Sequence, residues 1–318
     1  MKPTGLGFAG VGWLGESLIK ELPGVTGLHV AGVQDARLDL AQAVAAKYGS
    51  PWSGDNFDDL LRLPGVDAVV ICTPNALHVP QATQALRAGK HVLVQKPLAL
   101  SFPDARAIVE LAHELGTLLV VAYSYRFLDT IAALRNALPA IGPARGVSAE
   151  FHNIYGPGPD KAWFFDRRLS GGGALLDLGV HLVDLALWLF EPEEVTLERA
   201  ELERGGIERE AKVRVRFGDG VALDLAVSWN APAAETRIAF EVVGERGRVR
   251  WENVAGSFFR FRTLQDDRVL LDRETRLRSD TLVAFARALE TDHAPNIDTR
   301  VYALIDQAYA RSRDTPVV

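Results

Sequence analysis

The chain has 318 residues, of which 48% are hydrophobic and 24% are charged, which gives ample length for a core and excludes a disordered or collagen-like protein. Its formal net charge is −6, whereas a general nucleic-acid binder carries an excess of basic residues. The single cysteine rules out an intramolecular disulfide framework, and with no apolar run long enough for a membrane span and no signal-peptide pattern, we expect a cytoplasmic protein.

The first 122 residues alternate short apolar runs with helical patterns. The predicted strands are residues 5–9, 28–34, 68–72, 91–95 and 118–122. The predicted helices are residues 14–22, 38–48, 77–88 and 103–115. Strands that are apolar on both faces and separated by helices indicate a parallel sheet covered on both sides. We therefore predict a doubly wound α/β domain over residues 1–122.

The pattern changes after residue 122, and residues 123–318 predict a second, α+β domain. Helices are expected over 131–138, 174–190, 282–290 and 300–310, and strands over 145–152, 212–217, 221–227, 238–243, 248–251 and 259–263. The Asp219-Gly220 pair between two alternating strands is typical of a two-residue hairpin turn. Period-two alternation predicts an open-faced, mostly antiparallel sheet with one apolar face and one polar face, the latter carrying Arg214, Arg216 and Asp224.

A glycine-rich loop, GVGWLG, lies at residues 10–15 between the first predicted strand and helix. Gly10, Gly12 and Gly15 suit a tight turn, close approach of a pyrophosphate and helix packing, and the N–H groups at Trp13 and Leu14 begin the helix. Asp35 ends the second strand at the offset expected for a ribose contact, which favours NAD, although Arg37 leaves NADP open. The alternative for both features is an ordinary turn.

Three further motifs carry a resemblance to a known family. They are CTPNALH at residues 72–78, AGKHVLVQKPL at 88–98 and GGGALLDLGVHLVD at 171–184. Together with the glycine loop they resemble the Gfo/Idh/MocA family, named for glucose–fructose oxidoreductase and inositol dehydrogenase. The resemblance is dense over residues 5–127 and 163–190, and it identifies the family without identifying a substrate.

The resemblance implies a Rossmann domain followed by an open-faced sheet domain, with an active site in the cleft between them and a homodimer or homotetramer. By matching motifs, the catalytic lysine is Lys96, and the catalytic Asp and His are Asp177 and His181. Cofactor contacts are expected from Thr73, Asn75, Gln95, Lys96 and His78, in addition to the glycine loop and Asp35. Gln95 departs from the family's usual glutamate and removes one negative charge.

The predicted helix at residues 174–190 is apolar almost all round, which indicates a buried helix. Asp177, His181 and Asp184 nevertheless fall on one stripe, and ionisable groups in a buried helix need partners. The stripe is either a satisfied structural network or part of a site. We expect His181 to take a hydroxyl proton, Lys96 to stabilise the developing alkoxide and Asp177 to orient the substrate, with Asp184 in a supporting role.

Weaker candidates for substrate binding are Arg126, His152, Tyr155 and Trp163, since charged and aromatic groups suit sugar rings. Helix capping or core packing are equally reasonable for them. The predicted function is NAD(P)-dependent oxidation or reduction of a sugar, cyclitol or related polyol. Three alternatives remain: an NAD-using sugar hydrolase or lyase, a non-catalytic sensor, and a metalloenzyme built on Asp177, His181, Asp184 and His152, although no metal site is predicted.

Overall fold

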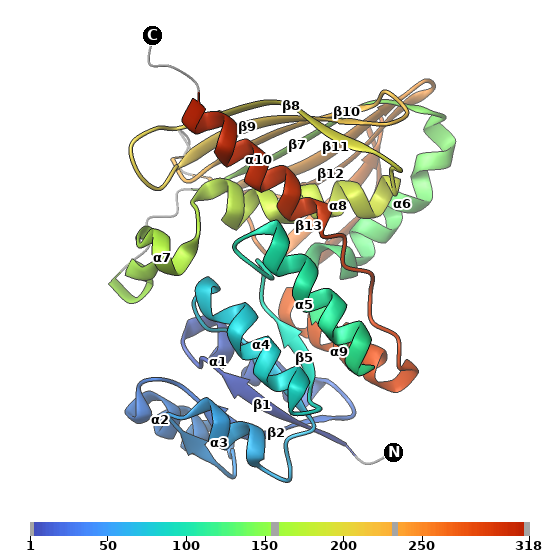
Figure 1. Ribbon diagram of the computed structural model, residues 1–318. Coiled ribbons are helices and arrows are strands. Elements are labelled where there is room, and N and C mark those ends of the chain that lie inside the picture. The colour runs from blue at the N-terminus through green and yellow to red at the C-terminus, as the bar shows by residue number, and fades with distance from the viewer. Residues whose placement is uncertain (1–2, 154–158, 231–234, 315–318) are drawn as a thin grey trace. The chain divides into compact units, whose positions relative to one another are not determined.

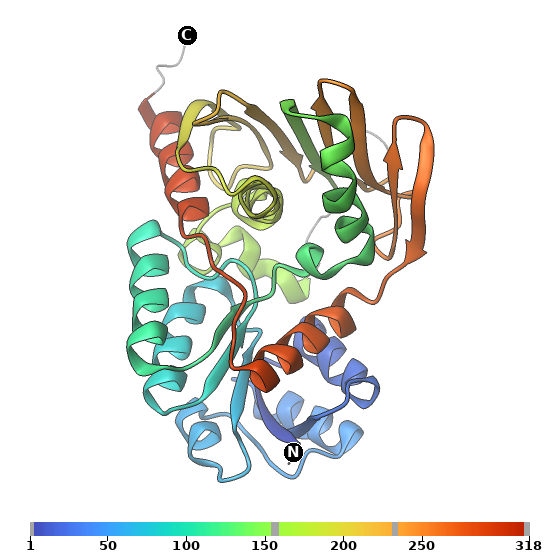
Figure 2. The same ribbon diagram turned by 90° about the vertical axis from the view of Figure 1, so that its right-hand side faces the viewer.

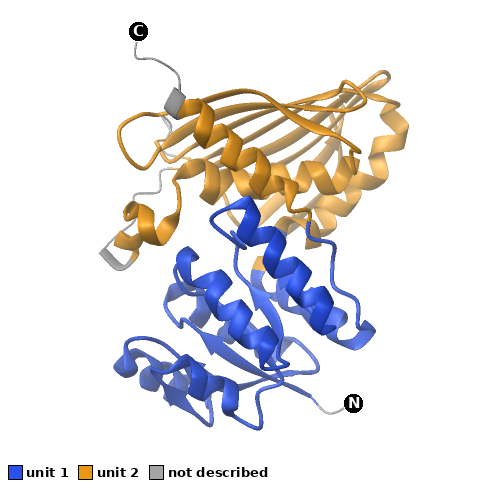
Figure 3. Ribbon diagram, viewed as in Figure 1, with its two compact units in different colours: residues 1–124, 278–297 blue, residues 125–277, 298–318 orange. Residues whose placement is uncertain are grey.

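The computed structural model describes residues 3–153, 159–230 and 235–314. Two compact units make up the chain (Figure 3): Met1–Ser124 with Arg278–Ile297, and Tyr125–Leu277 with Asp298–Val318. We call them unit 1 and unit 2. Residues 278–297, assigned from the sequence to the second domain, group with unit 1 because Leu282 and Phe285 are buried in its hydrophobic core.

Unit 1 contains a six-stranded parallel sheet in the order β3-β2-β1-β4-β5-β6. Figure 1 labels its strands β1, β2 and β5. Its strands are β1 (Thr4–Ala9), β2 (Leu28–Gln34), β3 (Ser53–Gly54), β4 (Ala68–Ile71), β5 (His91–Val94) and β6 (Leu119–Val121). Its helices are α1 (Trp13–Glu21), η1 (Leu22–Gly24), α2 (Leu38–Tyr48), α3 (Phe57–Arg62), η2 (Asn75–Leu77), α4 (His78–Arg87), α5 (Phe102–Leu115) and nearly all of α9 (Leu277–Thr291). This confirms the predicted doubly wound α/β domain. The strand β3, of two residues, and the helix α3, of six, were not predicted, because both are too short to show a periodic pattern.

Unit 2 contains an eight-stranded sheet in the order β14-β13-β12-β11-β7-β10-β9-β8. Its strands are β7 (Ala144–His152), β8 (Val195–Leu202), β9 (Glu210–Phe217), β10 (Ala222–Ser228), β11 (Arg237–Gly244), β12 (Gly247–Asn253), β13 (Arg260–Gln265) and β14 (Arg268–Glu274). Among the described strand pairs, β10 and β7 run parallel and the others antiparallel, which confirms the predicted mostly antiparallel sheet. The predicted hairpin turn joins β9 to β10, and Gly220 there has a φ of +90° that favours glycine.

Helices cover one face of this sheet. The helices of unit 2 are η3 (Ser124–Phe127), α6 (Asp129–Ile141), η4 (Pro159–Phe165), α7 (Arg167–Ser170), η5 (Leu175–Gly179), α8 (Val180–Phe190) and α10 (Arg300–Asp314). Of these, α6, η5, α8 and α10 pack against the strands. Figure 2 shows α8 end-on beneath the curved sheet. We call the covered side, with buried Val213 and Val215, the inner face, and the side with Arg214 and Asp224 the outer face.

The predicted helix at residues 174–190 is interrupted by one turn of π-helix, η5, before α8 begins. A π-turn inserts an extra residue per turn and rotates the residues before it relative to those after it. By length and composition, Arg167–Phe190 is apolar enough to cross a membrane, but 72% of its apolar window is buried within the protein, as in a core helix.

Candidate active site

The strands of the unit 1 sheet end in register at one edge. Ala9, which ends β1, pairs with Gln34 of β2 and with Ile71 of β4, and Ile71 pairs with Val94 of β5. The segments that follow these ends carry the predicted cofactor residues Gly10, Asp35, Thr73, Asn75, Gln95 and Lys96. The order of the strands reverses between β1 and β4, the place where doubly wound sheets bind their ligands.

The three loop glycines have distinct structural reasons. Gly10 has a φ of +79°, and a Cβ there would lie 2.9 Å from the backbone of Cys72. A Cβ on Gly15 would lie 2.1 Å from the carbonyl oxygen of Gly10, so close packing of α1 requires glycine there. Gly12 has nothing within 4 Å of its Cβ position, and no side chain caps α1 at this residue. This open helix N-terminus fits the pyrophosphate of a dinucleotide.

Asp35 is held at the glycine loop by backbone hydrogen bonds. The Val11 N–H donates to its Oδ2 over 2.9 Å, and the Arg37 N–H donates to Oδ1 over 3.0 Å. The Arg37 guanidinium is 4.0 Å from Oδ1 and its side chain is 64% exposed. The carboxylate is therefore directed beside the loop, where it suits the ribose hydroxyls of NAD.

His78 occupies a different place from the expected cofactor contact. Its ring is 1% exposed, with Nδ1 2.7 Å from the Pro97 carbonyl oxygen and Nε2 2.9 Å from that of Thr73. Both nitrogens are engaged by backbone, so the side chain ties the segment after β4 to the segment after β5. As a correction, His78 supports the Lys96-Pro97 turn, because burial leaves it no surface for a cofactor.

The other predicted residues at this edge differ in their surroundings. Thr73 donates its hydroxyl to Gln81 Oε1 over 2.6 Å, and Asn75 is buried. The Gln95 N–H donates to the Ile71 carbonyl over 2.9 Å, while its side chain and that of Lys96 are partly exposed. Burial raises the pKa of the Cys72 thiol, as for a cysteine that packs as a small apolar side chain.

Trp13 on the glycine loop is 63% exposed, and the Arg278 guanidinium lies 4.8 Å from its ring centroid. Arg278 comes from α9, far away in the sequence, and adds a positive charge beside the loop. Sequence reasoning missed it, because a single arginine in a polar stretch carries no signal of its tertiary neighbours.

In unit 2, Asp177 lies within η5 and His181 lies in the first turn of α8. The Trp229 indole donates from Nε1 to Asp177 Oδ2 over 3.1 Å. The His181 ring packs on Tyr125, with centroids 5.0 Å apart and planes tilted by 46°. Burial, with a further contribution from the charge of Asp177, raises the pKa of Tyr125. Trp229 and Tyr125 were both missed, since each is distant in sequence from the motif that it touches.

Arg126 was expected as a substrate contact, and the structure places it elsewhere. Its guanidinium donates from Nε to Asp184 Oδ2 over 2.7 Å, and Nη2 donates to Oδ1. The two side chains are 4% and 1% exposed. This correction has a plain cause: a buried carboxylate on α8 needs a partner, and the bidentate guanidinium supplies it.

His152 was also expected to bind substrate. It lies on β7 with Nε2 3.5 Å from Glu150, on the outer face, opposite the inner-face residue Phe151 that packs on Tyr125. His152 is therefore on the other side of the sheet from α8, which corrects that expectation. No group of three or more His, Cys, Asp or Glu side chains that suits a metal ion occurs within the described ranges.

Trp163 lies in η4, where its ring packs on Phe164 with centroids 4.0 Å apart and planes tilted by 30°. Phe164 and Phe165 in turn meet Trp229 edge-on, at 6.1 and 6.0 Å. The predicted residue Trp163 thus contacts Phe164, which in turn contacts Trp229, the donor to Asp177. Tyr155 lies outside the described residues.

Comparisons with known proteins agree with these features. Residues 4–123 match the family described as "Oxidoreductase family, NAD-binding Rossmann fold", and residues 135–250 match "GFO/IDH/MocA C-terminal domain". The chain is similar to 1,5-anhydro-D-fructose reductase of Ensifer adhaerens, with 33% identity over 72% of this chain and 70% of the relative. It is also similar to D-glucoside 3-dehydrogenase of Escherichia coli, with 33% identity over 51% of this chain and 46% of the relative.

A solved structure, GenD2 from gentamicin A biosynthesis in complex with NAD, is 26% identical and superimposes with a TM-score of 0.85 over 99% of this chain and 95% of its own. The two family matches together span most of the chain. The chain therefore belongs to the Gfo/Idh/MocA family of oxidoreductases with an NAD-binding Rossmann fold.

Proposed function

We propose that this oxidoreductase transfers a hydride between NAD and a CH–OH group of a sugar, cyclitol or related polyol. The observation that carries the proposal is the carboxyl edge of the unit 1 sheet, where the open glycine loop, the Asp35 carboxylate and Lys96 follow neighbouring strands. Dehydrogenases and reductases of sugars among the relatives support the substrate class.

NAD, when bound, supplies the hydride acceptor at C4 of its nicotinamide. Gly10, Gly12, Gly15 and the N–H groups at Trp13 and Leu14 would hold the pyrophosphate, and Thr73, Asn75 and Gln95 would line the adjoining part of the edge. The Asp35 carboxylate would accept hydrogen bonds from the ribose hydroxyls and repel a 2′-phosphate. We therefore propose that the protein binds NAD in preference to NADP.

Three side chains would carry the proton chemistry. His181 takes the proton of the reacting hydroxyl, because imidazole has a suitable proton affinity near neutral pH. Lys96 donates a hydrogen bond to the same oxygen and stabilises its negative charge as the hydride leaves. Asp177, one oxygen of which accepts a hydrogen bond from Trp229, accepts another from a substrate hydroxyl and so orients the sugar ring. In the reductive direction His181 returns the proton.

The aromatic residues near Asp177 suit a sugar. Phe165 is 44% exposed and meets Trp229 edge-on. An exposed aromatic ring packs well on the apolar face of a pyranose while its hydroxyls reach polar partners. We therefore propose that Phe165 and Trp163 contribute to the substrate side.

The test is a panel of aldoses, glucosides, anhydro sugars and cyclitols, each incubated with the purified protein and NAD or NADP. We expect the absorbance of reduced nicotinamide to rise with at least one substrate, and faster with NAD. Cleavage of a glucoside without net reduction would instead indicate a hydrolase or lyase that uses NAD transiently. Reduced nicotinamide binding without turnover on any substrate would indicate a sensor.

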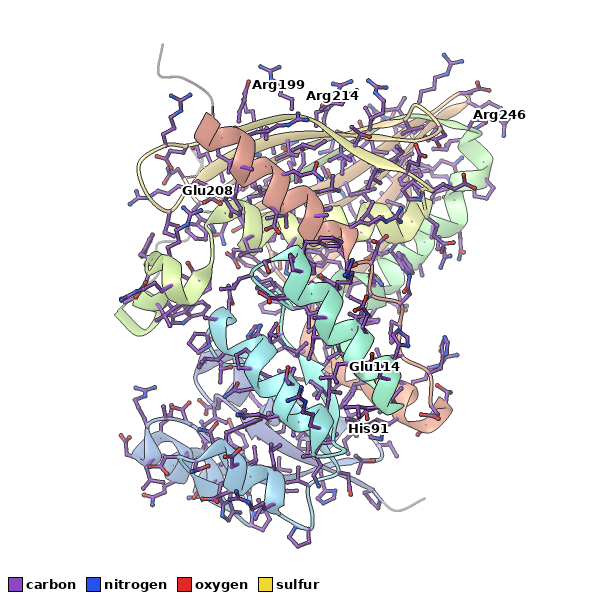
Figure 4. The ribbon with its side chains drawn as sticks, in the orientation of Figure 1. His91, Glu114, Arg199, Glu208, Arg214 and Arg246 are labelled. Atoms are coloured by element: carbon purple, nitrogen blue, oxygen red, sulfur yellow. The ribbon has the colours of Figure 1, made fainter. Side chains whose placement is uncertain are left out.

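We further propose a cytoplasmic homodimer or homotetramer in which unit 2 serves both substrate binding and assembly. The outer face of its sheet has a hollow of about 500 Å³, lined by side chains of both charges that include Arg199, Glu201, Arg214 and Asp224 (Figure 4 labels Arg199 and Arg214). Interspersed opposite charges suit contact with a second copy of the same surface. Mass measurement in solution, with Arg214→Glu as the disrupting variant, tests this assembly.

A further inference from the structure

A buried carboxylate that the proposed chemistry does not use lies where the glycine turn meets η5. Glu208, labelled in Figure 4, is 3% exposed and belongs to the connection between β8 and β9. The Gly173 N–H donates to both of its oxygens over 3.0 Å, and the Leu175 N–H donates to Oε1 over 3.1 Å. The Tyr309 hydroxyl of α10 also donates to Oε1, over 2.7 Å. Glu208 thus accepts hydrogen bonds from N–H groups at the N-terminal end of this helical segment.

The glycine turn before η5 is shaped to admit these two side chains. A Cβ on Gly172 would lie 2.0 Å from the Tyr309 hydroxyl oxygen, and a Cβ on Gly173 would lie 1.9 Å from the Glu208 carbonyl oxygen. That carbonyl accepts the Ala174 N–H over 2.9 Å. Glycine is therefore required at both positions by close contact with Glu208 and Tyr309.

The same connection reaches Asp177 by two routes. The Asp177 N–H donates to the Gly173 carbonyl over 2.9 Å, so the turn that Glu208 holds sets the backbone of Asp177. The Trp229 N–H donates to the carbonyl of Arg209, the residue after Glu208, over 2.7 Å, and the Trp229 indole donates to the Asp177 carboxylate. Backbone and side chain of Asp177 both depend on this short segment.

We propose that Glu208, together with Tyr309, is a positioning residue that fixes the direction of the Asp177 carboxylate. The assignment rests on the proposed function in so far as Asp177 orients the substrate. A π-turn interrupts the regular hydrogen-bond ladder of an α-helix, and such turns are frequent at functional sites. Glu208 and Tyr309 supply such partners at its N-terminal end, and Trp229 supplies one at the carboxylate itself.

The electrostatic surroundings favour a strong hold on the turn. Burial raises the pKa of Glu208, whereas the Tyr309 hydroxyl and the N–H groups of Leu175 and Gly173 lower it. The Arg167 guanidinium lies 5.4 Å from the Tyr309 ring centroid. Three donors meet this one buried carboxyl group, the Gly173 and Leu175 N–H groups and the Tyr309 hydroxyl, and together they hold the turn.

The first test does not depend on activity. In the full-length ¹⁵N-labelled protein, the Trp229 indole N–H resonance reports its bond to Asp177, and Trp229→Phe assigns it among the six tryptophans. We expect Glu208→Gln and Tyr309→Phe to shift this resonance and to accelerate amide hydrogen exchange at Gly173, Leu175 and Asp177. Glu245→Gln, at an exposed carboxylate paired with Arg145, is the matched control and leaves both unchanged.

The second test separates positioning from mere stability. We expect kcat of Glu208→Gln to fall by roughly 10- to 100-fold, as for a small misplacement of a reacting group, with the Kd for NAD unchanged. We expect kcat of Glu208→Ala to fall further than that of Glu208→Gln, because the glutamine side chain keeps one hydrogen-bond acceptor for the turn. A purely structural role would lower Tm and leave kcat per folded molecule and the indole resonance as in the wild type.

The results have distinct meanings. An unshifted Trp229 resonance in both Glu208→Gln and Tyr309→Phe overturns the positioning assignment, whatever the enzyme does. A wild-type protein that turns over no substrate overturns the proposed function instead, and the resonance and exchange measurements still decide the role of Glu208. If Glu208→Gln does not fold, Tyr309→Phe carries both measurements, since it removes one donor and keeps the carboxylate.

Discussion

The two candidate clusters, one in each unit, are held in place in different ways. At the edge of the unit 1 sheet, Gly10, Thr73 and Lys96 lie within two residues of the ends of paired strands. Backbone bonds such as Gly10 N–H to the Gln34 carbonyl, 2.8 Å, set their positions. In unit 2, the residues around α8 are held by side chains from distant segments. Trp229 is 52 residues from Asp177, and Tyr309 is 101 residues from Glu208.

This difference has a consequence for substitution. A cluster set by strand ends tolerates the loss of one side chain, because its neighbours keep their backbone positions. A cluster set by side-chain bonds loses its arrangement when one partner is removed, since the other is left buried and unsatisfied. We therefore expect substitutions in the unit 1 cluster to lower activity and leave stability unchanged. Substitutions in the unit 2 cluster are expected to lower both activity and stability.

The largest expected effect is that of Lys96→Ala. Because its position depends on backbone after β5, we expect kcat to fall by about 10²- to 10⁴-fold while Tm and NAD affinity stay close to wild type. Steady-state kinetics and fluorescence titration with reduced nicotinamide measure the two quantities. Lys47→Ala, at an exposed lysine of the same unit, is the control. Near wild-type turnover in Lys96→Ala would remove the lysine from the mechanism.

Arg126→Ala is expected to act on stability first. The substitution leaves the Asp184 carboxylate buried without the Arg126 guanidinium. We expect this to lower the free energy of unfolding by about 3–5 kcal/mol. Urea unfolding measures this, with Arg145→Ala at the exposed pair with Glu245 as a control of much smaller effect. A variant that is stable but has a raised substrate KM would restore Arg126 as a substrate contact.

A smaller effect is expected at the ribose end of the cofactor. Asp35→Ala removes an anionic acceptor that the Val11 and Arg37 N–H groups hold in place, so NAD binding weakens by roughly ten- to hundredfold while NADP is bound no worse. The ratio of kcat/KM for the two cofactors measures the shift. Asp39→Ala, at an exposed carboxylate of α2, keeps the wild-type ratio. An unchanged ratio in Asp35→Ala contradicts the ribose assignment.

The smallest effect concerns pH and His91, labelled in Figure 4 at the start of β5. Burial lowers the pKa of His91 below 6.5, partly offset by the charges of Asp292 and Asp67, and the Leu118 N–H donates to its Nδ1. The unfolded chain therefore takes up a proton at this residue before the folded protein does. Stability from His91 is present above about pH 6.5 and is lost as the pH falls from there through the folded pKa.

His91→Asn keeps an acceptor for Leu118 without a group that titrates in this range. We expect its free energy of unfolding to depend less on pH between about pH 7 and about pH 5 than that of the wild type. His113→Asn, at an exposed histidine of α5, keeps the wild-type dependence. Equal slopes for His91→Asn and the wild type would show that His91 keeps its ordinary pKa.

Much of unit 1 could be predicted from local pattern. The strand and helix order, the glycine loop and Asp35 are each visible in a short window, because a parallel sheet places consecutive strand ends at one edge. The role of His78 could not be predicted, since its two carbonyl partners lie in separate loops. Arg278 was equally hidden, because residues 278–297 follow the last strand of unit 2 in the sequence and yet belong to unit 1.

In unit 2 the sequence by itself determined part of the secondary structure: the alternation of β9 and β10, the hairpin turn and the apolar helix with its Asp177 and His181 motif. The π-turn η5 and the strands β8 and β14 were not predicted. Only the tertiary structure decided the partners of the ionisable groups, which joined Asp184 to Arg126, Asp177 to Trp229 and Glu208 to Tyr309. Periodicity reports which face of an element is buried. It carries no information about which donor, many residues away, meets a carboxylate once that face is covered.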